Sequence, residues 1–217
     1  MTVPLAPKFV VIDDFLSQDL IAALDELARA GRHAMELTEL GGAPGEAYSA
    51  LRKLWVRDGA LGALEPAFRS AMMGCFERLC ADTGVGPFEV ARVETEVCAQ
   101  RPGSYFAKHV DTDTGELSKS LRTDRLISAV FYFPHEPLAF SGGELILYDF
   151  TGKVPAAQIA PARNRLVAFP SFAYHEVTPV AAGEDSFDAA RWSVNCWFHR
   201  ARKSEPRAKA DDRKSTH

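Results

Sequence analysis

Two residues of the sequence, His109 and Asp111, are suited to bind one metal ion from neighbouring positions. A single residue separates them, in a segment whose composition predicts a strand. Side chains two positions apart in a strand point to the same side, so this imidazole and this carboxylate would converge on one point. The pair is a weak signal alone, because so short a pattern also occurs by chance.

His175 offers a third ligand. It follows a predicted apolar strand and a turn, and it begins the stretch His-Glu-Val-Thr-Pro-Val. A single histidine in such a place is usually a core or rim residue. Joined with His109 and Asp111, it completes the two-histidine, one-carboxylate set of non-haem Fe(II) oxygenases, which leaves positions open for substrate and O₂. Zinc can use the same ligands, although a structural zinc site is closed by four.

Arg191 lies inside the aromatic segment ARWSVNCWF. A buried guanidinium is costly without an anion, and its rigid fork of donors matches a carboxylate. The arginine therefore either pairs with an internal Asp or Glu or grips the distal carboxylate of a dicarboxylate ligand. Strand alternation gives the segment two faces, one lining a cavity and one packing on helices. The face that lines the cavity would carry Arg191, Ser193, Asn195 and Trp197. The face that packs on the helices would carry Trp192, Val194, Cys196 and Phe198.

The elements that must position these residues change in kind along the chain. The first part is expected to contain a strand at 8–12, a helix from Ser17 to Gly31, a loop at 40–50 and a helix from Pro66 to Gly84. Strands are expected at 88–98, 104–109, 126–133, 144–149, 164–169, 175–180 and 191–198. Successive strands without helices between them favour antiparallel sheets. The predicted fold is α+β, with a double-stranded β-helix core (a cupin-like jelly roll) backed by N-terminal helices.

The chain is expected to form a single domain. Its 217 residues, 47% of them apolar and 25% charged, have the size and composition of one globular unit. We expect that unit to span residues 1–200, with mainly helical support over 1–85 and the jelly-roll core over 86–200. Residues 201–217 are expected to be a basic, disordered tail.

Composition also bears on location. No stretch approaches 18 apolar residues, and the N-terminus lacks a basic start and an apolar signal core, so neither a membrane span nor export is expected. The four cysteines include no CxxC pair, which argues against a thiolate zinc site. They are expected to be small buried residues in a reducing cytoplasm.

Charge is unevenly placed along the chain. The net charge is −4, but residues 200–217 hold seven Lys or Arg against three Asp or Glu, so the remainder carries −8 (−4 minus +4). Such an acidic body argues against a nucleic-acid groove. The basic tail is interpreted as a solvated end, or else as a weak electrostatic arm for an acidic partner.

The chain resembles a known family at this point. The segments around the candidate ligands, AQRPGSYFAKHVDTD and VAFPSFAYHEVTPV, are similar in order and spacing to those of Fe(II)/2-oxoglutarate-dependent oxygenases. The intervening RLISAVFYFP and SGGELILYD, and the N-terminal FVVIDDFLSQDLIAAL, resemble the prolyl 4-hydroxylase-like branch. The resemblance spans about residues 8–200 and rests on the combination of motifs, since no single one is decisive.

The resemblance implies a set of roles. His109, Asp111 and His175 would bind Fe(II), and Arg191 would pair with the 5-carboxylate of 2-oxoglutarate. These four residues would form the catalytic centre of a dioxygenase that hydroxylates a C–H bond, with succinate and CO₂ as co-products. The cofactors implied are Fe(II), 2-oxoglutarate as co-substrate and O₂, with ascorbate as a further candidate.

Four further residues would contact the co-substrate. Ser193 or Asn195 would assist Arg191, and Tyr132 matches a tyrosine that often contacts 2-oxoglutarate in the family, although it is equally suited to be a core aromatic. Gln100 stands where relatives often carry a tyrosine, and an amide can still donate a hydrogen bond. A second departure is the polar stretch AAGEDSFDAA before Arg191. We expect a lengthened hairpin loop there, because a shift of one residue would turn Arg191 out of the cavity.

Substrate and partners are less defined. A prolyl residue in a polypeptide is the first expectation from the resemblance, and a free amino acid or small metabolite is the alternative. The segments 40–58 and 101–125 either rim the entrance or are ordinary surface loops. No nucleic-acid or membrane partner is expected, and both monomer and homodimer stay open. The competing functions are an oxygenase that repairs alkylated nucleic acid, a non-catalytic jelly-roll binding module and a zinc-dependent hydrolase.

Overall fold

A computed structural model of the chain describes residues 5–40, 52–57, 61–112 and 122–202. Strands dominate it, and most belong to one strongly curved antiparallel sheet in the order β1-β10-β6-β13-β4-β3-β5-β11-β8-β9, with β2 paired to β3. A second sheet contains β12 and β7. The strands are β1 Val10–Ile12, β2 Met35–Leu40, β3 Arg52–Arg57, β4 Arg92–Gln100, β5 Tyr105–His109, β6 Thr123–Tyr132, β7 Phe140–Gly142, β8 Leu145–Tyr148, β9 Pro155–Ile159, β10 Arg165–Pro170, β11 His175–Val177, β12 Val180–Ala182 and β13 Arg191–Ala201.

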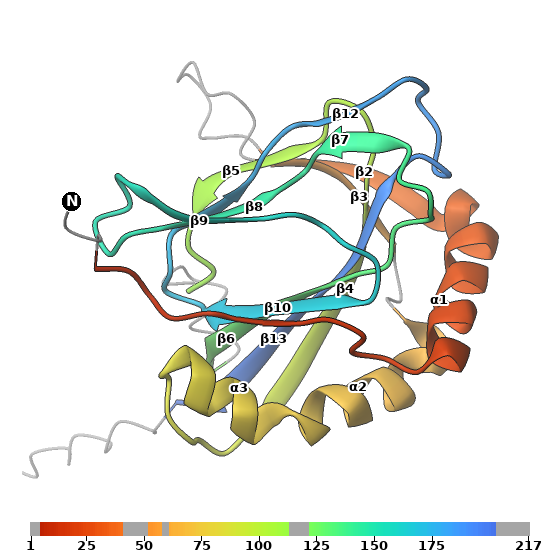
Figure 1. The fold of residues 1–217 in the computed structure, drawn as a ribbon. Helices are drawn as coiled ribbons and strands as arrows, with labels where there is room; N and C mark the ends of the chain where they lie inside the picture. Colours follow the sequence, from red (N-terminus) through yellow and green to blue (C-terminus); the bar gives the residue numbers. More distant parts are fainter. Residues whose placement is uncertain (1–4, 41–51, 58–60, 113–121, 203–217) are drawn as a thin grey trace, which may run out of the picture.

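The curved sheet forms two facing walls (Figure 1). Strands β10, β6, β13 and β4 make the wall beside the helices, and β5, β11, β8 and β9 make the opposite wall. Strand β3 joins the walls, because it pairs with both β4 and β5. This arrangement confirms the predicted jelly-roll core with helices on one side.

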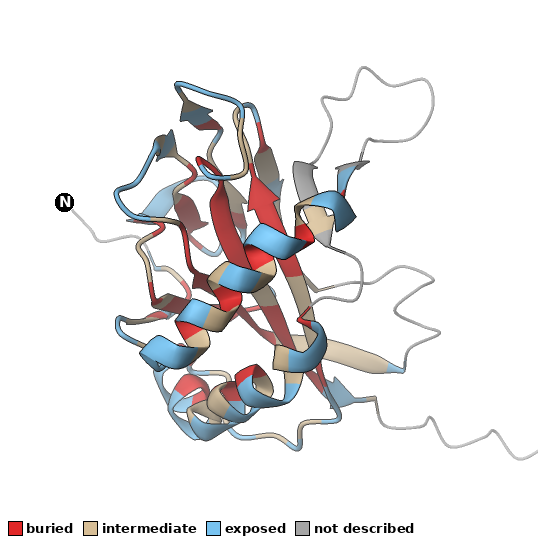
Figure 2. Ribbon diagram, turned by 90° about the vertical axis from the view of Figure 1, so that its right-hand side faces the viewer, coloured by how far each residue is buried: buried red, intermediate tan, exposed pale blue. Residues whose placement is uncertain are grey.

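The first helix, α1 Gln18–Ala30, confirms its predicted limits. The Ser17 hydroxyl accepts a hydrogen bond from the backbone of Leu20 at its N-terminus, and Gly31 caps the other end. Its apolar stripe of Ile21, Leu24 and Ala28 is buried, and Figure 2 shows the helix lying across the buried strands.

The second predicted helix is two helices, α2 Glu65–Gly74 and α3 Phe76–Thr83. Cys75 separates them with a non-helical backbone, and its thiol contacts the carbonyl of Met72. Gly84 ends α3 in the left-handed conformation that glycine adopts without strain. The predicted end is therefore confirmed, while the break was invisible in an uninterrupted helical pattern. Two short 3-10 segments, Gly31–Ala34 and Gly62–Leu64, adjoin α1 and α2.

The main core lies between the helices and the neighbouring wall. The even-numbered residues of β13 face it, as strand alternation predicted, and pack with α1, α2 and α3. The contributing side chains are Trp192, Val194, Cys196 and Phe198 with Leu24, Phe68, Met72 and Leu79. The other face of β13 is thereby left for the space between the two walls.

The expectation of a loop over 40–58 is wrong in its second half. Residues 52–57 form β3, which pairs with β2 as well as with the core strands, while 41–51 and 58–60 lie outside the described residues. The sequence RKLWVR conceals this strand, because its charged residues break the apolar alternation. The short strands β7 and β9 were also not predicted, and the strand expected at 175–180 is divided between β11 and β12 near Pro179.

Two other expectations can be placed against the structure. All four cysteines are unpaired, with Cys75 half-buried and the others buried. None of the described helices combines the length and apolarity that a membrane crossing needs. The tail beyond residue 202 lies outside the described residues, so its predicted disorder stays a prediction, as do the domain boundaries.

Candidate active site

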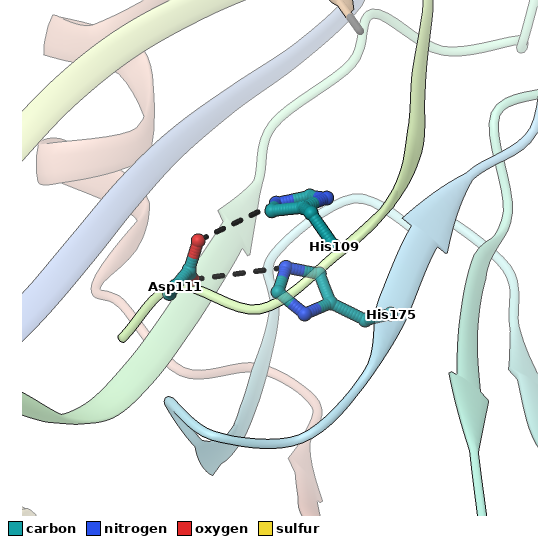
Figure 3. Close-up of side chains that lie close together, drawn as sticks. All are labelled: His109, Asp111 and His175. Atoms are coloured by element: carbon teal, nitrogen blue, oxygen red, sulfur yellow. Dashed lines mark ion pairs between the residues drawn. The ribbon is translucent and has the colours of Figure 1, made fainter. Parts of the chain in front are cut away.

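Three potential metal ligands meet between the two walls (Figure 3). His109 is the last residue of β5 and His175 is the first of β11, and these two residues lie opposite each other in the antiparallel pair. Asp111 completes the group, with Oδ1 3.4 Å from His109 Nε2 and Oδ2 3.7 Å from His175 Nε2. One ligand atom from each residue lies within 4.8 Å of the others. The structure thus brings together the three residues that the sequence singled out.

The reason for their convergence differs in part from the one predicted. Strand β5 ends at His109, so Asp111 lies beyond the strand rather than within it. Its position depends instead on the loop before His175, because the backbone N–H groups of Asp111 and Thr112 donate to the carbonyl of Ser171 at 2.9 and 3.1 Å. A long-range contact, and not strand alternation alone, therefore sets the carboxylate beside the imidazoles.

Both imidazoles turn the same nitrogen toward the centre. His109 Nδ1 lies 2.7 Å from the carbonyl of Ala107, and His175 Nδ1 lies 2.9 Å from that of Ala173. A carbonyl only accepts, so each Nδ1 carries a proton, and in the neutral ring this leaves the lone pair on Nε2, which faces the centre. Among the described residues His109 Nε2 is buried without a hydrogen-bond partner. A divalent cation would satisfy that atom, so the residues present fit a metal.

The charges at the centre suit the same interpretation. Burial lowers the pKa of His175 to about 4, outweighing the opposite effect of Asp111, so the imidazole is neutral near pH 7. Burial alone would raise the pKa of Asp111, but His175, His109 and hydrogen bonds outweigh it and hold this pKa well below its ordinary value. The centre thus offers one carboxylate and two imidazoles, a donor set of the type that binds Fe(II).

Two residues that the sequence did not single out hold Asp111. Its Oδ2 accepts hydrogen bonds from Ser128 Oγ at 2.6 Å and from Trp197 Nε1 at 2.8 Å. Alternation along β13 placed Trp197 on the cavity side, but nothing in the sequence paired it with Asp111. Ser128 reaches the site because β6 and β13 align it opposite Trp197. That register is a property of the folded sheet.

Arg191 lies elsewhere in the same cavity, at the start of β13. It is 2% exposed, its Nε donates to the carbonyl of Gly143 at 2.7 Å, and its Nη1 donates to Gln100 Oε1. Its Cζ stands 4.7 Å from the centre of the Tyr132 ring. Within the described part of the chain no carboxylate forms an ion pair with it, which favours the interpretation that it grips an anionic ligand. Burial lowers the pKa of this guanidinium, and an anion in the cavity would offset that cost.

The other predicted contacts divide into two groups. Gln100, Ser193 and Asn195 line the cavity together with Arg191 and the three candidate ligands. Tyr132 is not part of the cavity wall, and its hydroxyl is buried without a hydrogen-bond partner among the described residues. Since Arg191 lies opposite Gln100 in β13 and β4, the polar stretch before it leaves the register intact, as expected.

Comparison with known proteins identifies the kind of fold and site. A family model described as the 2OG-Fe(II) oxygenase superfamily matches residues 95–199. An uncharacterised PKHD-type hydroxylase of Synechocystis sp. is 32% identical over 145 residues, covering 64% of this chain and 46% of the relative. A PKHD-type hydroxylase of Shewanella sp. strain ANA-3 is 37% identical over 83 residues, covering 38% of this chain and 34% of the relative. The chain therefore spans less than half the length of these curated relatives.

Solved structures agree in fold. A prolyl-4-hydroxylase of Pseudomonas putida superposes with a TM-score of 0.62 at 23% identity, over 89% of this chain and 93% of that one. A prolyl hydroxylase of Trichoplax adhaerens, solved with a peptide fragment of the hypoxia inducible factor oxygen degradation domain, has a TM-score of 0.63 at 19% identity, over 88% and 83%. The family match, the curated relatives and the fold agree that the chain is similar to the 2OG-Fe(II) oxygenase superfamily, whose enzymes use Fe(II), 2-oxoglutarate and O₂.

Proposed function

We propose that the protein is an Fe(II)- and 2-oxoglutarate-dependent hydroxylase that acts on a prolyl residue of a polypeptide. One observation carries the proposal: a two-histidine, one-carboxylate centre shares its cavity with a buried arginine that has no anionic partner among the described residues. A metal ion fits the first feature and the distal carboxylate of a dicarboxylate fits the second. A zinc hydrolase accounts only for the first feature, and turnover distinguishes an enzyme from a non-catalytic jelly-roll module that keeps a metal site.

The metal would be held by His109, Asp111 and His175. The buried Nε2 of His109, which has no hydrogen-bond partner among the described residues, and the neutral state of His175 support this assignment. Fe(II), when bound, supplies O₂ activation coupled to decarboxylation of 2-oxoglutarate to succinate and CO₂, and thereby the oxidant for a C–H bond. The protein's own contribution is to orient the reactants and to keep bulk water away, since the three side chains are at least 88% buried.

Arg191 would bind the 5-carboxylate of 2-oxoglutarate. Its Nε and Nη1 already donate to Gly143 and Gln100, which fixes the plane of the guanidinium and leaves its remaining N–H groups for a ligand. Because the Gln100 oxygen faces the arginine, its amide N–H₂ is left as a second donor to the carboxylate. This chain thus replaces the tyrosine common in relatives with an amide that both orients Arg191 and can bind the ligand.

Ser193, Asn195 and Tyr132 would complete the co-substrate site. The first two line the cavity from the same face of β13 as Arg191. The Tyr132 hydroxyl lacks a hydrogen-bond partner among the described residues, and burial raises its pKa, so it would remain a neutral donor. A carboxylate beside Arg191 would give this buried hydroxyl an acceptor.

The prolyl substrate is proposed from the relatives. The two structural neighbours described above are prolyl hydroxylases, one of them solved in complex with a peptide, and the curated relatives are PKHD-type hydroxylases. We also propose that the enzyme works in the cytoplasm, where four unpaired cysteines suit the reducing conditions.

The test joins ligand binding with turnover. Thermal unfolding without O₂ should show stabilisation by Mn(II), and further stabilisation when 2-oxoglutarate is added with Mn(II) but not when succinate replaces it. Ligand at 100 times its Kd adds about 2.7 kcal/mol. Arg191→Ala should lose the response to 2-oxoglutarate and keep that to Mn(II), while His175→Ala should lose both.

Turnover is then measured with Fe(II) on a library of proline-containing peptides, by succinate release and by a gain of one oxygen atom in the mass spectrum. Modification at proline supports the full proposal. Turnover of free amino acids with no reaction on any peptide would replace the polypeptide substrate by a small molecule. No response to 2-oxoglutarate in the metal-loaded protein would refute the proposed function.

A further inference from the structure

Two side chains of the described residues donate hydrogen bonds to Asp111, and both donate to the same oxygen. Ser128 and Trp197 both donate to Oδ2, from opposite strands of the β6–β13 pair. Oδ1 accepts no hydrogen bond from these two donors and lies 3.4 Å from His109 Nε2. Figure 3 shows the carboxylate facing both imidazoles. The two oxygens of this carboxylate therefore have different environments before any metal binds.

We propose that Trp197 and Ser128 are positioning residues that restrict Asp111 to binding the metal through Oδ1 alone, and that Arg125 braces Trp197 for this task. The inference rests on the proposed function, because it takes the three side chains of Figure 3 as metal ligands. Two donors on Oδ2 compete with a second metal–oxygen bond and oppose rotation of the carboxylate. A ligand held through one oxygen leaves more of the coordination sphere open for other groups.

Trp197 is itself held in place by a cation over its ring. The Arg125 guanidinium carbon lies 4.1 Å from the centre of the indole ring, in a cation–π contact. Glu94 holds Arg125 through hydrogen bonds of 3.0 and 3.3 Å, and His199 Nε2 lies 2.9 Å from the same carboxylate. Arg125 thus holds the indole ring and Glu94 holds Arg125, so the indole N–H keeps a constant direction.

Ser128 is fixed just as closely. Its hydroxyl has one proton, which is committed to Asp111, so the Ser171 hydroxyl 2.9 Å away donates to Ser128 Oγ. The Ser171 carbonyl also accepts the backbone N–H of Asp111 at 2.9 Å. Backbone and side chain of Asp111 are therefore both tied to the loop that precedes His175, and the two donors to Oδ2 approach from fixed positions.

The experiment measures metal binding by the full-length chain and does not depend on turnover. Mn(II) is titrated without 2-oxoglutarate, and the free ion is counted from its electron paramagnetic resonance signal. Trp197→Phe and Ser128→Ala should each raise the Kd for Mn(II) by about 10-fold, and the double variant by up to about 100-fold, as for other residues that orient metal ligands.

Trp192→Phe is the matched control. This residue lies on the same strand with its side chain in the helix-side core, and its indole N–H donates to the carbonyl of Phe187 at 2.9 Å. The control therefore also loses an indole hydrogen bond on β13, but not one to Asp111. Its Kd for Mn(II) should stay within about twofold of the wild-type value. Arg125→Gln should weaken Mn(II) binding by a smaller factor than Trp197→Phe, because the indole N–H is still present.

A second measurement separates positioning from general loosening. Co(II) bound to the wild-type chain gives a visible absorption band whose intensity falls as the coordination number rises. If Trp197→Phe frees Oδ2 to bind as well, the band should weaken in this variant at saturating Co(II) and stay unchanged in Trp192→Phe. A merely structural role would lower affinity without changing the spectrum of the saturated protein.

The outcomes distinguish this inference from the proposed function. Wild-type Mn(II) affinity and an unaltered Co(II) spectrum in both Trp197→Phe and Ser128→Ala would overturn the inference and leave the metal site standing. Losses no larger than those of Trp192→Phe would overturn it equally. If the wild-type chain bound no Mn(II), or if His109→Ala bound it as well as wild type, the proposed metal site would fall and the inference with it.

Discussion

Replacement of Gly143 by alanine should disturb Arg191 and leave the metal centre alone. Gly143 has φ of +71°, and a Cβ there would lie 2.6 Å from Arg191 Cδ and 3.2 Å from its Nε. The 2.6 Å distance is too short for two carbon atoms and the 3.2 Å distance is tight, so the side chain of Arg191 must move away. The move also breaks the 2.7 Å hydrogen bond from Arg191 Nε to the carbonyl of Gly143. The guanidinium would then no longer face a carboxylate from its fixed position.

The size of the effect follows from these contacts. A left-handed alanine costs about 1–2 kcal/mol of folding stability. A misplaced hydrogen bond to a charged group costs about 1.5–3 kcal/mol more. This second cost should lower the free energy of 2-oxoglutarate binding. The affinity for 2-oxoglutarate should therefore fall about 10- to 100-fold, since 1.4 kcal/mol corresponds to a factor of about ten. Titration calorimetry of 2-oxoglutarate into Mn(II)-loaded protein measures it directly.

Gly103→Ala is the matched control for backbone strain. Gly103 has φ of +79°, but a Cβ there meets no atom of the described residues within 4 Å. Both variants should lose similar stability from the left-handed backbone, and only Gly143→Ala should lose 2-oxoglutarate affinity. Mn(II) affinity should be unchanged in both. Equal 2-oxoglutarate affinities in Gly143→Ala and Gly103→Ala would refute the role assigned to the Arg191 geometry.

Three further predictions concern other parts of the structure. Asp111→Ala should abolish Mn(II) binding measured by paramagnetic resonance, because it removes the charged ligand; binding at wild-type strength would refute the assignment. Asn164 has φ of +57° and hydrogen-bonds both the N–H and the carbonyl of Leu16, at 2.8 and 3.0 Å. Asn164→Ala should lower the free energy of unfolding, measured in urea, by about 2–4 kcal/mol. Asn164→Gly should lower it less, since glycine adopts a positive φ without strain, and the reverse order would contradict this account. Burial alone would raise the pKa of Glu94, but a hydrogen bond from His199 and the charges of Arg125 and Arg92 lower it from 4.5 to about 2. The ionised Glu94 therefore contributes its full share to the free energy of unfolding above pH 4.5, and this contribution is lost as the pH falls toward 2. Glu94→Gln should lower the free energy of unfolding by up to about 3 kcal/mol at pH 6. In a series of unfolding measurements at different pH, the difference in this free energy between variant and wild type should shrink below pH 4.5, and a constant difference would exclude the linkage.

The sequence identified features that depend on near neighbours in the chain. Alternation along residues 191–198 predicted correctly which face packs on the helices, because successive side chains of a strand point to opposite sides. Ser17 and Gly84 marked helix ends for equally local reasons, a hydroxyl that caps and a glycine that accepts a left-handed backbone. His109 and Asp111 stood out by spacing, and the structure does bring them together with His175.

The tertiary structure alone decided the contacts that complete the site. Asp111 lies beyond its strand and is placed by the Ser171 carbonyl, while Ser128 and Trp197 reach it through the register of β6 and β13. The partners of Arg191 were equally hidden, since Gln100 is 91 residues away in sequence and Gly143 is 48 away. Strand β3 escaped notice because charged residues interrupt its pattern.

These limits have one physical cause. Periodicity in a sequence reports which way a side chain points relative to its own strand or helix. It does not report which strand lies alongside, or at which register, because that choice depends on burying all apolar faces at once. The ligand types of this protein can therefore be read from its chain, whereas the second layer of residues that orients them exists only after the sheet has closed around the cavity.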